Sequence, residues 1–77
     1  MSLKNISPSV FRDFLKDKGL NYIGTKGGHE KWSKKDMLRP VIFQTHIDPI
    51  PEFIIRNNLR SMNCTAKDLE AWLHPKK

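Results

Sequence analysis

The sequence predicts a small α+β domain in which helices cover one face of a three-stranded antiparallel sheet, in the order α-β-β-β-α-α. Three short runs rich in β-branched and aromatic residues follow one amphipathic stretch and precede two more. The pair Gly27-Gly28 separates the first two runs, which is typical of a tight hairpin. Because 77 residues suffice for one domain only, we expect a single domain over residues 1–77, with its core at about residues 8–73.

The first helix is predicted from Pro8 to Lys18. Ser7 is a good N-cap, and Pro8 suits the first turn, where its missing N–H is not needed. Gly19 follows as a left-handed C-terminal cap, with Leu20 folding back onto the helix. The apolar face at helical spacing consists of Val10, Phe11, Phe14 and Leu15. The opposite, polar face consists of Arg12, Asp13, Lys16 and Asp17.

Three strands are predicted, from Leu20 to Thr25, from His29 to Ser33 and from Arg39 to Thr45. Side chains alternate between the two faces of a strand. Trp32 is expected on the core face of the second strand, so His29 should face outward. Glu30 shares the face of Trp32, whereas Lys31 and Ser33 share the face of His29.

The C-terminal third is predicted to hold a stiff proline loop at residues 47–51 and two helices. Pro51 suits the first turn of a helix that runs to about Asn63. Its expected buried stripe is Phe53, Ile55, Leu59 and Met62, with Ile54 at the margin. Thr65 and Asp68 resemble a capping box before a short third helix. The apolar residues of that helix are Leu69, Trp72 and Leu73.

The charge of the chain narrows its possible partners. The formal net charge is +6 and the pI about 9.8, and residues 26–39 hold five basic and two acidic residues. Clustered positive charge favours a polyanionic partner, although a basic surface can also serve solubility alone.

Cys64 is the only cysteine, so no internal disulfide is possible. With no apolar run long enough for a signal peptide or a membrane span, we expect a cytoplasmic protein without membrane contact.

His29 follows the glycine turn directly and has lysines on both sides in the sequence. An imidazole with an ordinary pKa of about 6.5 can accept or donate a proton near neutral pH. Backbone N–H groups in a glycine turn can donate to an anion, and lysines can hold phosphates. The pattern therefore predicts a phosphodiester-processing site with His29 as the catalytic acid/base. The predicted phosphate-binding residues are Lys26, Gly27, Gly28, Lys31, Lys34 and Lys35.

Other candidates have competing explanations. His46 is either a second proton-transfer or RNA-contacting group or an ordinary strand-end residue, and His74 is expected at the surface. Trp32 and Trp72 could stack on bases, but core packing is the expected role of both. Arg56 and Arg60 lie four residues apart on the second helix and could bind RNA, contact a partner or be solvated. The histidines lack metal-site spacing, so we expect no metal and no other cofactor.

These residues together resemble the HicA family of mRNA-interferase toxins. The resemblance rests on the helix ending in Lys18-Gly19, on Lys26-Gly27-Gly28-His29, on His46 and on the segment Asn58-Leu59-Arg60-Ser61-Met62. It covers about Val10 to Leu73. The family has a Gly-Ser-His motif, in which the serine is replaced here by Gly28. A proline two residues before the strand-end histidine is replaced by Gln44.

The resemblance implies a double-stranded-RNA-binding-domain-like α-β-β-β-α fold, here with a short extra C-terminal helix. It also implies a ribosome-independent, metal-independent endoribonuclease with His29 as its catalytic histidine, the toxin of a type II toxin–antitoxin system. The expected partners are an mRNA substrate and a HicB-like antitoxin protein, with operator DNA reached only through the antitoxin.

Two alternatives remain at this point. The chain could be a non-catalytic double-stranded-RNA-binding module, which would recognise phosphates and 2′-hydroxyls by shape. It could also be an inactivated toxin that only binds its antitoxin. Such RNA-binding modules usually carry lysines at the start of the last core helix. The segment Pro51-Glu52-Phe53-Ile54-Ile55 has none, which favours the enzyme.

Overall fold

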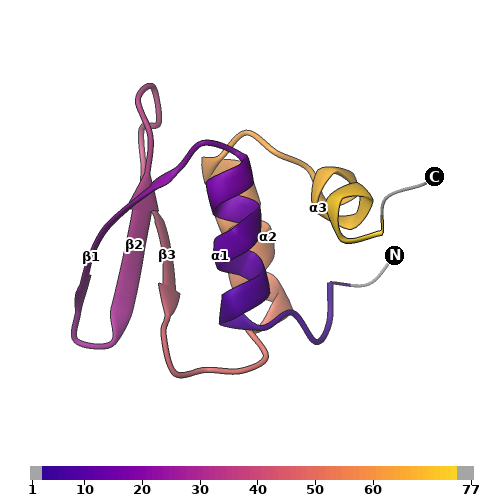
Figure 1. Cartoon of the computed structure of the whole chain (residues 1–77), viewed down its shortest axis with the longest axis horizontal. Helices are drawn as coiled ribbons and strands as arrows, with labels where there is room; N and C mark the ends of the chain where they lie inside the picture. The colour runs from indigo at the N-terminus through magenta and orange to yellow at the C-terminus, as the bar shows by residue number, and fades with distance from the viewer. Residues whose placement is uncertain (1–2, 75–77) are drawn as a thin grey trace.

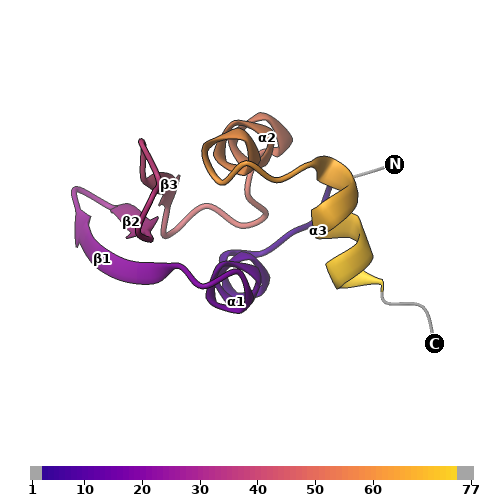
Figure 2. The same cartoon turned by 90° about the horizontal axis from the view of Figure 1, so that it is seen from above.

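The computed structural model describes residues 3–74 and has the predicted element order. Its elements are α1 (Pro8–Asp17), β1 (Asn21–Lys26), β2 (His29–Ser33), β3 (Val41–Gln44), α2 (Glu52–Ser61) and α3 (Ala66–Leu73). The strands form one antiparallel sheet in the order β1-β2-β3. Figures 1 and 2 show α1 and α2 on one face of this sheet, with α3 beyond them on the side away from it. Within residues 3–74 no helix covers the other sheet face, here called the outer face (Figure 2).

Both ends of α1 follow the sequence prediction. The Ser7 side chain accepts a hydrogen bond of 3.1 Å from the backbone N–H of Val10. Gly19 has a φ of +86°, a left-handed conformation that glycine adopts without a Cβ clash. The backbone N–H of Leu20 then donates to the carbonyl of Leu15 at 2.9 Å. These bonds end the helix at Asp17 and turn the chain toward β1.

The core lies between the inner sheet face and the helices. Its buried apolar residues are Leu3, Ile6, Phe11, Phe14, Leu15, Leu20, Trp32, Val41, Phe43, Ile50, Ile55, Leu59, Met62 and Leu69. Trp32 is buried as predicted, and Trp72 packs edge-to-face on Phe14 with ring centroids 5.6 Å apart. The chain before α1 also contributes, because the Ile50 N–H donates to the Ile6 carbonyl at 2.8 Å.

One predicted core residue is on the surface. Phe53 is 65% exposed, so its assignment to the buried stripe of α2 was wrong. Successive helical residues are about 100° apart, so Phe53 points about 200° away from Ile55. Ile55, Leu59 and Met62 are buried as expected.

Asn58 joins α2 to the edge of the sheet. Its side-chain amide donates to the Ile42 carbonyl at 2.8 Å, and its side-chain oxygen accepts from the Ile42 N–H at 3.2 Å. The side chain thus takes the place of a neighbouring strand at this point of β3, and it is 93% buried (7% exposed). An edge strand would otherwise leave these backbone groups unpaired. The contact fixes the position of α2 relative to β3.

Candidate functional site

The glycine turn places His29 at the first position of β2. Gly27 and Gly28 have φ values of +59° and +80°, the positive pair that a two-residue type I′ hairpin requires. Lys26 and His29 are therefore paired across the two strands. His29 lies on the outer face and is exposed, as the alternation of side chains predicted. The histidine is thus held on regular backbone at the end of the hairpin.

Gln44 is the hydrogen-bonding neighbour of the histidine. It lies opposite His29 on β3, and the Nε2 atoms of the two side chains are 3.3 Å apart. The amide nitrogen of Gln44 can only donate, so it donates this bond and His29 Nε2 accepts it. The ring is therefore held through Nε2, and no hydrogen bond to Nδ1 occurs within residues 3–74. Gln44 had not been expected to act at this site.

The inner face of β2 is anchored directly beside His29. Glu30 is only 3% exposed, and its carboxylate accepts two bonds of 2.8 Å from Arg12, one of 2.6 Å from Trp32 and one of 3.1 Å from Thr45. Burial by itself raises the pKa of Glu30, but the bonds from Arg12 and Trp32, the Arg12 charge and Thr45 outweigh it and lower the pKa. Glu30 is therefore a buried carboxylate that stays ionised and ties α1 and β3 to β2.

Arg12 was predicted on the polar face of α1, opposite the apolar face, but its contact with Glu30 was not predicted. Its side chain is 32% exposed and reaches across to Glu30. The signal available in the sequence was Glu30 itself, because a carboxylate on the face of Trp32 needs a cationic partner to be buried. Helical periodicity alone cannot identify which basic residue supplies it.

His46 lies at the same end of the sheet as His29. The backbone N–H of Thr45 donates to the Gly28 carbonyl at 2.9 Å, which holds the chain after β3 against the hairpin turn. His46 follows in this turn and is exposed. The structure therefore brings both predicted histidines to one end of the sheet, whereas His74 follows α3, away from the sheet (Figure 1).

The predicted lysines divide into two groups. Lys26 and Lys31 are exposed on the outer face near His29. Lys34 and Lys35 follow the far end of β2, roughly 16 Å from His29 at about 3.3 Å per residue. The Lys34 Nζ donates to the Lys18 carbonyl at 3.1 Å, near the end of α1. Lys34 and Lys35 thus lie at the other end of β2 from His29.

An apolar groove of about 360 Å³ adjoins the histidine. It lies between the end of β3 and the start of α2, and His29 and Gln44 line one side of it. Three of its apolar residues are unusually exposed: Ile42 at 37%, Ile47 at 41% and Phe53 at 65%. Exposed apolar residues gathered in one groove are typical of an interaction surface.

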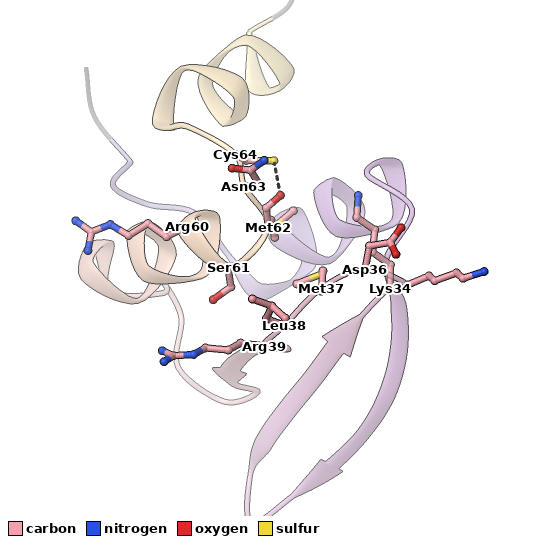
Figure 3. A pocket seen from close by; sticks show the side chains of 11 residues that line it. Lys34, Asp36, Met37, Leu38, Arg39, Arg60, Ser61, Met62, Asn63 and Cys64 are labelled. Carbon is pink, nitrogen blue, oxygen red and sulfur yellow. Dashed lines mark hydrogen bonds between the residues drawn. The ribbon is translucent and has the colours of Figure 1, made fainter.

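A second groove, of about 910 Å³, lies at the opposite end of the sheet and is shown in Figure 3. The loop between β2 and β3 forms one wall, and the end of α2 with the following turn forms the other. Its charged lining residues are Lys34, Lys35, Asp36, Arg39 and Arg60. We call it the basic groove.

Two general features of the described part of the chain bear on its function. Within residues 3–74 no group of three or more His, Cys, Asp or Glu side chains is placed to hold a metal ion. In the same range no helix has the length and apolar character needed to cross a membrane.

Comparison of the chain with protein-family models, with curated proteins and with solved structures gives no match. The function must therefore be inferred from the residues and their geometry.

Proposed function

We propose that this chain is an endoribonuclease toxin of the HicA type that cleaves RNA with His29 as general acid/base. The observation that carries the proposal is the position of His29: exposed on the outer face, held through Nε2 by Gln44 and adjoined by the glycine turn. Lys26 and Lys31 lie beside it on the same face and supply positive charge for a phosphate. The arrangement has the proton-transfer group and the cations that RNA cleavage needs.

The layer order supports the same proposal. A helix, a three-stranded antiparallel meander and a second helix on the same face are the arrangement that a double-stranded-RNA-binding-domain-like fold would have. The short helix α3 then stands as an addition at the C-terminus. The proposed fold leaves the outer face open to a ligand (Figure 2).

The proposed reaction uses the nucleophile that RNA itself carries. The 2′-hydroxyl loses its proton to a base and its oxygen bonds to phosphorus, while the bond from phosphorus to the 5′-oxygen breaks and that oxygen takes up a proton. His29 serves in one or both proton transfers. Lys26 and Lys31 stabilise the negative charge on the phosphate, together with backbone N–H groups of the turn. His46, at the same end of the sheet, is the candidate for a second proton-transfer group.

Cleavage of a labelled single-stranded RNA by the purified protein, with EDTA present, tests this proposal. We expect cleavage in EDTA, because the proposed chemistry uses side chains of the chain and no metal. An otherwise identical oligonucleotide with 2′-deoxyribose at the cleaved positions should resist, because it lacks the nucleophile. Cleavage that requires an added divalent ion, or that ignores the 2′-deoxy substitution, would contradict the mechanism.

The apolar groove beside His29 supports a protein partner for the same site. We propose that a HicB-like antitoxin, in the cytoplasm, covers this groove and blocks access to the histidine. Burying Ile47 and Phe53 would remove exposed apolar surface from water and so favour the complex. Affinity purification of the tagged chain from cells that express it with its neighbouring reading frame tests the proposal. We expect a small partner that inhibits cleavage and is lost with Phe53→Ser but not with Arg56→Ala.

A further inference from the structure

The residues that line the basic groove carry an excess of positive charge. Four basic residues and one acidic residue line it, a net formal charge of +3. Arg39 lies in the loop before β3 and Arg60 in the last turn of α2, and both are exposed. Neither arginine side chain forms a hydrogen bond or ion pair with another residue of the range 3–74. In Figure 3 the two side chains extend in the same direction from opposite walls of the groove.

Neighbouring basic residues differ from these two. Arg56 lies one turn before Arg60 on α2, but its Nε donates to Glu52 at 2.9 Å and it does not line the groove. Lys34 is held at the end of α1 by its bond to the Lys18 carbonyl. The guanidinium groups of Arg39 and Arg60 are thus available to bind a ligand in the groove. A guanidinium group can donate two parallel hydrogen bonds to one phosphate.

Cations also follow the strand that connects this groove to His29. Lys31 is exposed in the middle of β2, and Lys35 follows its far end. Positive groups at intervals over roughly 16 Å match a polymer with repeated negative charges better than a single small anion. The groove and the histidine are therefore placed to contact different nucleotides of one strand.

We propose that Arg39 and Arg60 form a phosphate-binding subsite for single-stranded RNA, which holds the strand several nucleotides away from the bond at His29. This proposal rests on the proposed ribonuclease function in one respect only, because that function identifies the bound strand as RNA. Its consequence is a dependence on length: RNA that reaches both ends of the sheet binds more tightly than RNA that reaches only the His29 end.

The test is the salt dependence of binding of an uncleavable 2′-O-methyl RNA oligonucleotide that is long enough to span both ends. Each phosphate contact to a single strand contributes about 0.7 to the slope of log K against log salt. We expect the double variant Arg39→Ala/Arg60→Ala to lower that slope by about 1.4. Arg56→Ala is the matched control and should leave the slope unchanged, whereas Arg39→Lys/Arg60→Lys should retain most of it. Far-UV circular dichroism checks that every variant is folded.

Several outcomes would overturn the subsite. These are an unchanged slope in the double alanine variant, an equal loss in Arg56→Ala, or equal affinity of long and short oligonucleotides. The two proposals can fail separately. If binding depends on Arg39 and Arg60 but the wild-type protein cleaves no RNA, the ribonuclease proposal is wrong and the subsite stands. If RNA cleavage depends on His29 and binding does not depend on these arginines, the reverse holds.

Discussion

Arg12 in α1 donates two hydrogen bonds of 2.8 Å to the two carboxylate oxygens of Glu30 in β2. The pair joins the first helix to the central strand at the residue that follows His29 in the chain. Because neighbouring residues of a strand point to opposite faces, anchoring Glu30 inside keeps His29 outside. The buried contact thus fixes the orientation of the proposed catalytic group.

Glu30 predicts a loss of stability in acid. The pKa of Glu30 is lower in the folded protein than its ordinary value of 4.5, so its contribution is present above that value and is lost as pH falls through the folded pKa. We expect the urea midpoint to decrease below about pH 4.5. Asp68, whose pKa is lowered by the Thr65 backbone N–H, adds to the same trend. At pH 7 the Glu30→Gln variant should be less stable than the wild type. Below pH 4.5 its urea midpoint should depend less on pH. A midpoint that decreases as steeply with acid in the variant as in the wild type would contradict this role.

Asn58 predicts a destabilisation that its neighbour does not share. Asn58→Ala removes both bonds to Ile42 and leaves the partly buried backbone N–H and carbonyl of Ile42 unpaired, so we expect the free energy of unfolding to decrease by about 2 kcal/mol. Asn57→Ala, one residue earlier and exposed, should change it by less than about 0.5 kcal/mol. Chemical denaturation of both variants measures the difference. Equal effects would show that the hydrogen bonds of Asn58 to the edge strand β3 do not stabilise the fold.

The backbone conformation of Gly28 indicates that restoring the serine of the Gly-Ser-His motif would lower the stability of the fold. A Cβ at Gly28 would meet nothing within 4 Å, but the φ of +80° strains side-chain-bearing residues. We expect Gly28→Ser to decrease the free energy of unfolding by about 1 kcal/mol, and Gly28→Asn by less, because asparagine tolerates the left-handed region. Thermal unfolding compares the variants. A serine variant as stable as the wild type would indicate that the turn adopts another conformation.

Substitution of Gln44 should lower the rate of RNA cleavage only when His29 is present. Gln44→Ala removes the contact that holds the ring, so we expect kcat for RNA cleavage to decrease, by up to about 10²-fold, with KM little changed. In a His29→Ala background the same substitution should have no further effect, because no ring remains to be oriented. Single-turnover kinetics of the four proteins measure this coupling. Additive losses would mean that Gln44 acts elsewhere.

The sequence predicts the local features of this molecule well. Ser7, Gly19 and the Gly27-Gly28 pair act through their own backbone and caps, so the ends of α1 and the hairpin follow from the residues themselves. Alternation in β2 also places Trp32 inside and His29 outside as predicted. These elements need no information about distant parts of the chain.

Features that depend on distant segments were not predicted. The bulge between Tyr22 and Gly24, which changes the register of β1, was not predicted either, although a glycine inside a strand is typical of a bulge. Gln44 meets His29 only through the pairing of β2 with β3. Arg39 and Arg60 share a groove because a loop and a helix end meet at one end of the sheet. Such contacts are set by tertiary packing, which local periodicity does not contain.

The most direct test of the proposed chemistry is the initial rate of RNA cleavage by His29→Ala relative to the wild type, in EDTA, with His74→Ala as the matched control. Positioned proton transfer contributes about 10²–10⁴-fold, so we expect a loss of that size in His29→Ala and none in His74→Ala. Folded His29→Ala protein that cleaves RNA at the wild-type rate would contradict the assignment of His29 as the catalytic acid/base.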